Sequence, residues 1–388
     1  MSDPAEAAGP HIYLVAGEES GDRLGAALIR ALRRARPGIR FSGIGGGHMA
    51  AEGVPSLFPL GDLAIVGFVA IVKSLPSILR RISEAADAVV AARPDMLVII
   101  DSPEFTHRVA RKVRARAPEI PIIDYVCPSV WAWRPGRARA MRAYVDRVLA
   151  LLPFEPEAMA RLGGPPTDYV GHPLNEQVPD LRPPDGPASR LGGTPLVLAM
   201  PGSRGGEIRF MADVFGEALG LAAAQGPFEV VVPTIPRLEP AVRAAVARWP
   251  VAARIVTDPG EKHAAFRQAR AALTKSGTST LELALAGVPM VAAYKVTKLE
   301  EWVGSILIKL PTVILANLVL GENIVPEFLQ GDCTSERLAA ALAPLLADTP
   351  ERRRQVDAFA GLDRVMNLGG PAPSDQAAAV VLATSRGI

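Results

Sequence analysis

The stretch IYLVAGEESGDRLGAALIRALRRAR, residues 12–36, indicates the fold class of the first half of the chain. Its first six residues form an apolar run of strand length, and the residues from Asp22 onward repeat apolar positions at helical spacing. The same change from a short apolar run to a longer amphipathic one recurs after residues 96–101, 121–126 and 148–153. Strands that alternate with helices in this way predict a doubly wound, Rossmann-like α/β domain with a parallel sheet.

A second α/β domain of similar size is predicted after a linker that is crowded with proline and glycine, which interrupt regular structure. The strand and helix alternation resumes with PLVLAMPG at 195–202 and continues to PMVAAYKV at 289–296. We expect the two domains to face a cleft at the carboxyl ends of their strands, where such sheets bind ligands. We expect an N-terminal domain at residues 1–173, a linker at 174–194 and a C-terminal domain at 195–345. Helices at 346–388 are expected to return to the N-terminal domain.

Composition indicates a cytoplasmic protein and argues against several functions. The 388 residues carry 42 basic and 40 acidic side chains, so no strong overall field attracts nucleic acid. The two cysteines, Cys127 and Cys333, give no disulfide framework, which fits a reducing compartment. The first ten residues lack the basic start and apolar run of a secretory signal. We also expect no transmembrane helix, because no uncharged apolar stretch reaches the roughly 20 residues that cross a bilayer.

Polar side chains that follow two first-half strands are candidates for catalysis. Glu18, Ser20 and Asp22 crowd the turn after the first strand, and Asp101 ends the strand MLVIID. Each could instead cap a helix, and for Asp22 alone the two readings are about even, since aspartate is a preferred cap. Three polar groups exceed what capping needs and favour a hydroxyl-rich ligand such as a sugar. For Asp101 we favour the role of general base for a sugar hydroxyl.

The segment YVCPSVWAWRPGRARAMR, residues 125–142, places two tryptophans before a run of arginines. Alternating tryptophans most often pack a domain edge, and arginines in a run most often form a solvated helix face. Trp131, Trp133 and Arg134 together would also suit a phosphorylated lipid or sugar, because apolar rings would lie beside a guanidinium group. The segment is therefore a candidate acceptor or membrane contact.

Two glycine-containing loops of the second half are candidates for binding a nucleoside diphosphate. AMPGSRGGEIRF, residues 199–210, matches neither common nucleotide fingerprint but offers backbone amides and an arginine at a helix start. TKSGTSTLELALAGVPMV, residues 274–291, adds a cluster of hydroxyls at another helix start, and Glu282 could accept from both ribose hydroxyls. A plain cap would need one hydroxyl rather than four. The candidates are Gly202, Ser203, Arg204, Ser276, Gly277, Thr278, Ser279 and Glu282.

Neither a metal site nor a cofactor motif is present in the sequence. No Asp-x-Asp pair occurs, the five histidines form no close ligand pair, and dedicated redox motifs are missing. We therefore expect the charge of a leaving diphosphate to be neutralised by Arg204 and helix dipoles. Three functions stay open at this point: transfer of a sugar from its nucleotide to an acceptor hydroxyl, epimerisation of a UDP-sugar at carbon 2, and binding of a sugar nucleotide or lipid without chemistry.

Several blocks of the chain, in order from about Gly17 to Gln330, resemble the lipid-A-disaccharide synthase family. They include GEESGDRLGA, DSPEF, CPSVWAWRPGRAR, PGSRGGEI, SGTSTLELALAGVPMV and NLVLGENIVPEFLQ. The resemblance implies an inverting B-type glycosyltransferase of Gram-negative bacteria that uses no cofactor. Its donor would be UDP-diacylglucosamine and its acceptor diacylglucosamine 1-phosphate, giving UDP and a β-1,6-linked disaccharide 1-phosphate on the route to lipid A.

By matching motif, the resemblance makes Asp101 the base for the acceptor's 6-hydroxyl, with Glu18 and Ser20 beside it. It places Arg204, Ser276, Thr278 and Glu282 at the UDP site, which residues of the last block would close: Asn317, Glu327 and Gln330. Glu19, Glu104 and Cys127 depart from the usual family residues, which leaves acyl-chain preference open. Whether the chain forms a homodimer is also open.

The segment GDLAIVGFVAIVKSLPSILRRI, residues 61–82, joins a long apolar face to basic residues near one end. Such a helix can be part of a core, but both implied substrates reside in a bilayer. A helix in the interface, with its basic residues near anionic head groups, would meet that need. We therefore expect peripheral association with the inner membrane through Val66, Phe68 and Val69.

Overall fold

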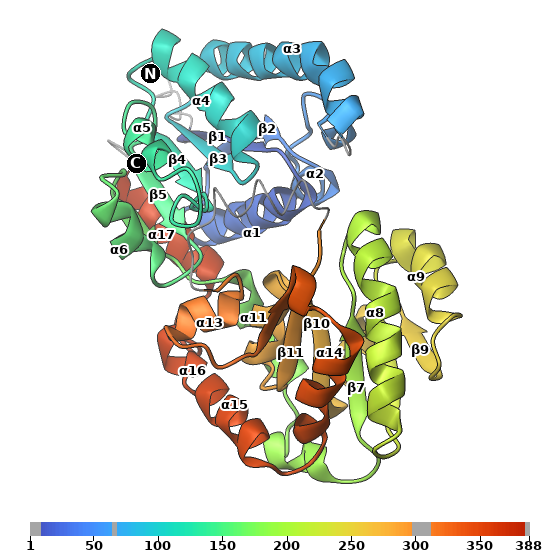
Figure 1. Ribbon diagram of the computed structural model, residues 1–388. Coiled ribbons are helices and arrows are strands. Elements are labelled where there is room, and N and C mark those ends of the chain that lie inside the picture. The colour runs from blue at the N-terminus through green and yellow to red at the C-terminus, as the bar shows by residue number, and fades with distance from the viewer. Residues whose placement is uncertain (1–8, 64–67, 297–311, 385–388) are drawn as a thin grey trace, which may run out of the picture. The chain divides into compact units, whose positions relative to one another are not determined.

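The computed structural model describes residues 9–63, 68–296 and 312–384, and only the backbone of residues 68–75. By packing, the chain divides into two compact units, shown in Figure 1. Unit 1 comprises residues 1–173 and 370–388, and unit 2 comprises residues 174–369.

Unit 1 is built on a parallel six-stranded sheet of order β2-β1-β3-β4-β5-β6. The two central strands β1 and β3 are buried at every position, which is why they read as unbroken apolar runs in the sequence. The strand order reverses between β1 and β3, and doubly wound sheets bind ligands beyond such a reversal. The strands are β1 (His11–Ala16), β2 (Arg40–Ile44), β3 (Met96–Ile100), β4 (Ile122–Tyr125), β5 (Arg147–Ala150) and β6 (Thr167–Tyr169).

Helices cover this sheet, and one of them comes from the far end of the chain. α17 packs against α1 (Figure 1), and Arg34 pairs with Asp375 at 2.6 Å. Ala377, Ala378 and Val381 of α17 are buried in the same core as α1. The helices are α1 (Glu19–Ala35), α2 (Gly47–Ala51), α3 (Phe68–Ala92), α4 (Pro103–Arg116), α5 (Gly136–Met141), α6 (Glu155–Arg161) and α17 (Pro373–Thr384).

Unit 2 contains a second parallel six-stranded sheet, of order β12-β11-β10-β7-β8-β9. The chain begins at β7, moves outward to β9, and returns to the other side of β7 with β10, so the order reverses between β7 and β10. The strands are β7 (Leu196–Met200), β8 (Glu229–Pro233), β9 (Ala253–Val256), β10 (Ala269–Lys275), β11 (Met290–Tyr294) and β12 (Glu327–Leu329). The helices are α7 (Val178–Leu181), α8 (Gly205–Ala223), α9 (Glu239–Val246), α10 (Pro259–Gln268), α11 (Thr278–Leu285), α13 (Leu315–Leu320), α14 (Ser335–Leu342), α15 (Pro350–Ala360) and α16 (Leu362–Val365).

Residues 174–194, where the linker was expected, belong to unit 2. Arg190 is buried and donates to the carbonyl oxygens of Phe266, Ala286 and Gly287. Burial lowers the pKa of Arg190 to about 10, and neighbouring arginines add to that shift. Arg190 therefore fastens the segment to unit 2 through carbonyl oxygens rather than a carboxylate.

The prediction of two doubly wound parallel sheets with a C-terminal helix returning to the first is confirmed. The part of the chain after residue 345 is divided, however: α15 and α16 stay with unit 2, and only residues from 370 onward join unit 1. None of the helices that the structure describes is long and apolar enough to cross a membrane.

Candidate functional site

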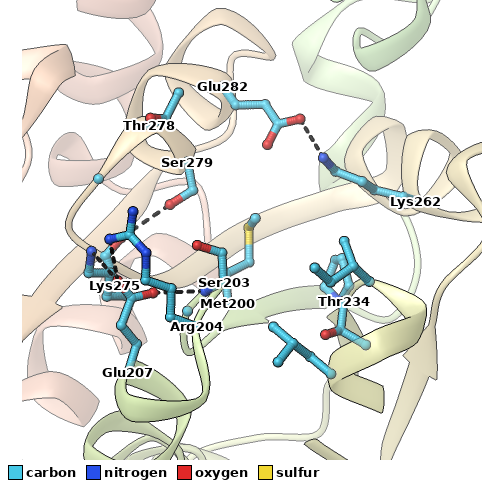
Figure 2. A pocket seen from close by; sticks show the side chains of 15 residues that line it. Met200, Ser203, Arg204, Glu207, Thr234, Lys262, Lys275, Thr278, Ser279 and Glu282 are labelled. Atoms are coloured by element: carbon cyan, nitrogen blue, oxygen red, sulfur yellow. Dashed lines mark hydrogen bonds and ion pairs between the residues drawn. The ribbon is translucent and has the colours of Figure 1, made fainter. Parts of the chain in front are cut away.

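A cavity of about 460 Å³ lies in unit 2 at the carboxyl ends of β7, β8 and β10. It occupies the reversal of strand order between β7 and β10, which is the expected ligand position in a doubly wound sheet. Figure 2 shows side chains from the loops after β7 and β10 converging on it. Seven sequence candidates line the cavity: Gly202, Ser203, Arg204, Gly277, Thr278, Ser279 and Glu282.

One end of this cavity is organised around Glu207, which the sequence indicates only as a helix-start residue. Its carboxylate accepts from the Ser203 backbone N–H at 2.8 Å and lies 3.0 Å from the Lys275 ammonium and 3.7 Å from Arg204. Burial alone would raise the pKa of Glu207, but those three partners outweigh it and hold the pKa below its ordinary value. Gly202 has φ +143°, and a Cβ there would come within 2.4 Å of the Glu207 side chain. Only glycine therefore allows the loop to close over this carboxylate.

The other end holds a second pair of opposite charges. Lys262 of α10 lies 2.5 Å from the Glu282 carboxylate of α11, and Figure 2 shows the two side chains meeting at the cavity edge. The remaining wall is less polar and comes from the segment after β8, with Thr234, Ile235 and Leu238. The cavity thus joins paired charges, three of them cationic and two acidic, to a less polar wall, a combination suited to a nucleotide's charged and flat parts.

The hydroxyls of the loop after β10 are partly used within the protein. Ser279 donates to the Lys275 carbonyl at 3.1 Å, and Thr280 donates to the Gly277 carbonyl at 2.8 Å. Ser276 is 5% exposed, and its hydroxyl has no hydrogen-bond partner within the described part of the chain. It does not line the cavity, so Thr278 and the backbone are the groups that this loop leaves available.

The three candidates from the last sequence block do not line this cavity either. Asn317 is 2% exposed, accepts from Ile324 and Val325 backbone N–H groups, and donates to the Val325 carbonyl. Glu327 accepts from Thr312 at 3.0 Å, and burial raises its pKa despite that bond. Asn317 and Glu327 thus fold the segment onto itself.

Gln330 adopts a left-handed backbone conformation, with φ +49°, and accepts from the Val296 N–H at 3.1 Å. Its side chain therefore ties the end of β12 to the segment that follows β11.

In unit 1 the candidate base lies at the reversal of strand order between β1 and β3. Asp101 follows β3 directly, and its carboxylate accepts from the Ser20 hydroxyl of α1 at 2.6 Å and from the Ser102 N–H at 2.7 Å. Gly17 allows the turn after β1 to approach the residues after β3, because a Cβ at position 17 would lie 2.5 Å from the Ser102 Cβ. The structure thus brings Ser20 and Asp101 together, as the sequence candidates require.

Asp22 has a structural role that extends beyond its own helix. It is 1% exposed and accepts from the backbone N–H groups of Gly46, His48 and Met49 at 2.7, 2.9 and 3.0 Å. The carboxylate therefore caps α2 rather than α1, which explains its burial without a ligand. Glu18 is exposed at the start of α1 and makes no side-chain cap bond.

A second cavity of about 240 Å³ lies next to Asp101 and is also lined by Cys127, Trp133, Arg134 and Arg137. The Arg134 guanidinium stacks over the Trp133 ring at 4.4 Å. Burial raises the pKa of the Cys127 thiol far above its ordinary value, so this cysteine stays protonated.

Trp131 lies beside this cavity but does not line it. It points into the protein, donates to Glu155 at 3.1 Å and packs edge-on against Phe154. Val66 and the side chains of Phe68 and Val69 lie outside the described residues.

The sequence interpretation did not single out Lys262 or Lys275, and it treated Glu207 only as a helix-start residue and Arg137 only as one of a run of arginines. Lys275 ends β10 and the less polar wall follows β8, so the rule that ligands bind beyond the carboxyl ends of strands could have found them. Lys262 lies on a helix and carried no such signal.

The described residues contain no group of three or more histidine, cysteine, aspartate or glutamate side chains that could hold a metal ion. The charged groups that face the larger cavity are lysines, an arginine and glutamates instead.

Comparisons with known proteins converge on one family. The model of the family described as lipid-A-disaccharide synthetase matches residues 12–379. A lipid-A-disaccharide synthase of Nitrobacter hamburgensis is 61% identical over 376 residues, covering 96% of this chain and 95% of that protein. One from Ruegeria pomeroyi is 46% identical, covering 87% and 86%.

Among solved structures, Acinetobacter baumannii MurG has a TM-score of 0.58 at 14% identity, covering 97% of this chain and all of that one. The UDP-GlcNAc 2-epimerase of Neisseria meningitidis, bound to UDP-GlcNAc, has a TM-score of 0.60 at 12% identity, covering 96% and 99%. At these identities the likeness concerns the fold alone.

Proposed function

The chain belongs to the lipid-A-disaccharide synthase family and has that family's activity in lipid A biosynthesis, and from this premise we propose how its two units divide the reaction. Unit 2 binds the UDP-diacylglucosamine donor, and unit 1 binds and activates the diacylglucosamine 1-phosphate acceptor. The observation that carries the proposal is the position of both candidate sites: the unit 2 cavity and the Ser20–Asp101 pair of unit 1 each lie where their own sheet reverses strand order.

The donor site is the 460 Å³ cavity of unit 2. Lys275 and Arg204, with the helix start at Gly205, supply positive charge for the diphosphate. Glu282 accepts from the ribose hydroxyls after exchanging its bond with Lys262. The segment Thr234–Leu238 offers an apolar wall for the uracil ring. A Neisseria epimerase of the same fold is bound to UDP-GlcNAc, which supports a UDP-sugar here.

The chemical step starts at Asp101. Its carboxylate takes the proton of the acceptor's 6-hydroxyl, and the hydroxyl oxygen attacks the donor's anomeric carbon from the face opposite the diphosphate. The bond between that carbon and the diphosphate oxygen breaks, UDP leaves, and configuration inverts. Ser20, which donates to Asp101 at 2.6 Å, holds the carboxylate in place. We propose that no metal is needed, because the lysines and Arg204 supply the charge.

A test of this division is UDP release by the purified enzyme in excess chelator. We expect UDP to appear together with disaccharide only when donor and acceptor are both present, and at the same rate with or without the chelator. An epimerase would convert the donor without any acceptor, and a binding protein would release nothing. Release independent of acceptor, or activity restored only by magnesium or manganese, would contradict the proposal.

We further propose that the enzyme associates peripherally with the inner membrane through Val66, Phe68 and Val69. The support is chemical, since both substrates carry acyl chains that stay in a bilayer, and the segment's apolar residues precede Arg80 and Arg81. The triple substitution of these residues by serine should reduce sedimentation with anionic liposomes severalfold while Tm stays near the parent value. Unchanged sedimentation, or an unfolded variant, would place the segment in the core.

A further inference from the structure

We propose that the 240 Å³ cavity beside Asp101 is a subsite for a phosphate monoester on the acceptor sugar, with Arg137 and Arg134 as its counter-charges. The inference rests on the proposed function and deepens it. Asp101, Trp133, Arg134 and Arg137 all line this one cavity, so a carboxylate and two guanidinium groups face the same space.

The charges around the cavity are unbalanced in favour of an anion. Glu104 is the acidic partner of three arginines at once: Arg137 at 2.7 Å, Arg134 at 3.6 Å and Arg108 at 3.8 Å. Burial opposes ionisation of Glu104, but these arginines outweigh it and hold its pKa below the ordinary value, so it stays charged. Together with Asp101, two carboxylates stand against three guanidinium groups, which still leaves excess positive charge. A phosphate would accept bidentate hydrogen bonds from these guanidinium groups.

Arg137 and Arg134 have complementary positions. Arg137 is mostly covered, with 15% of its side chain exposed, and its geometry is fixed by the bond to Glu104. Arg134 is 55% exposed, and its guanidinium lies over the Trp133 ring. A guanidinium stacked on a ring keeps its edge N–H groups free for an anion. One arginine is thus preorganised, and the other can move onto a ligand.

Backbone strain gathers at the same place. Seven described residues other than glycine have positive φ, and three of them line this cavity: Asp101 at +55°, Val126 at +99° and Arg134 at +52°. Ser102, at +48°, is the neighbour of Asp101. Such conformations are strained for residues other than glycine and gather at functional sites. A β-branched residue such as Val126 is a pronounced outlier. The left-handed backbone positions therefore coincide with the wall of this cavity.

The cavity's size suits a head group rather than a whole lipid. At about 240 Å³ it lies below the range of roughly 300–1,000 Å³ typical of sites for drug-sized ligands. A glucosamine carrying an anomeric phosphate has its reactive 6-hydroxyl at one end of the ring and the phosphate at the other. That arrangement matches a cavity with a base and arginines on its wall, and it leaves the acyl chains outside.

The test compares Arg137→Ala with the parent enzyme in detergent free of phospholipid, using the phosphorylated acceptor and the same sugar lipid without its phosphate. We expect the parent to prefer the phosphorylated acceptor. Arg137→Ala should raise KM for that acceptor roughly tenfold to hundredfold, as loss of a charge-assisted bond predicts, with little change in KM for the dephosphorylated acceptor or for the donor. Arg137→Lys should recover part of the loss.

Arg139→Ala is the matched control, because Arg139 is an exposed arginine of the same helix and does not line the cavity. If Arg137→Ala weakens both acceptors equally, its role is structural and the inference is wrong. If the parent itself does not distinguish the two acceptors, the proposal of a phosphate subsite is also wrong. If phosphatidylglycerol vesicles then restore a preference, the arginines are assigned to a membrane head group instead. If the parent transfers sugar to neither acceptor, the proposed function itself has failed.

Discussion

Replacing Asp101 by asparagine should lower kcat roughly 100- to 10,000-fold, the range that general-base assistance contributes. Asparagine has nearly the same shape but cannot take a proton from the acceptor's 6-hydroxyl. The local structure should survive, because the backbone bonds of residue 101 to Tyr125 and Thr106 do not involve the side chain. An asparagine oxygen can also still accept from Ser20 or Ser102.

Two further measurements make the Asp101→Asn result interpretable. UDP affinity by calorimetry and Tm should both match the parent, since the cavity proposed for the donor consists of unit 2 residues only. Ser20→Ala serves as the comparison, because it removes only the 2.6 Å bond to the carboxylate. We expect it to cost far less than Asp101→Asn. A kcat near the parent value in Asp101→Asn would remove this residue from the mechanism.

The two sheets could be predicted because strands that are buried on both faces are recognisable in the sequence. β1 and β3 are buried at every position, and parallel strands of this kind appear as unbroken apolar runs between amphipathic helices. The candidate positions followed from the same logic, since Asp101 and the loop after β10 come directly after strands. What the sequence could not supply is the partner of each group, which depends on how loops fold in space.

Asp22 illustrates that limit. In the sequence it looks like a cap of its own helix or a ligand group, yet its carboxylate binds three N–H groups more than 20 residues away, at Gly46, His48 and Met49. Periodicity carries no information on such distant partners.

The segment from Leu315 onward presents the same difficulty. The Asn317 side chain is satisfied by Ile324 and Val325, which lie only a few residues further on. A motif shared with a family can therefore have a structural role, such as forming a turn, as well as a role in binding a ligand.

Charged side chains that the sequence did not indicate are the main addition that the structure makes to the proposed donor site. The sequence reading gave the diphosphate one side-chain cation, Arg204, whose side chain is 78% exposed. Lys275 is more covered, at 16%, and lies 3.0 Å from Glu207. Its ammonium also lies 4.5 Å from the centre of the Tyr294 ring. A covered ammonium in a fixed position interacts more strongly with a developing charge than an exposed, mobile one.

We therefore expect Lys275→Met to lower kcat roughly 100- to 1,000-fold, the cost of losing one preorganised group at a site where charge develops. Methionine keeps much of the length and the contact with Tyr294 but removes the charge that the leaving diphosphate needs, and Lys275→Arg should restore part of kcat. The matched control is Lys262→Met, which removes the other lysine of the cavity, paired at 2.5 Å with Glu282. Because Lys262 lies at the proposed ribose end, its loss should change the donor KM more than kcat. If both variants raise the donor KM alone, Lys275 serves binding. If Lys275→Met acts only by lowering Tm, because the Glu207 carboxylate has lost its partner, Lys275 serves folding. In either case the leaving group must be stabilised by Arg204 and the helix start.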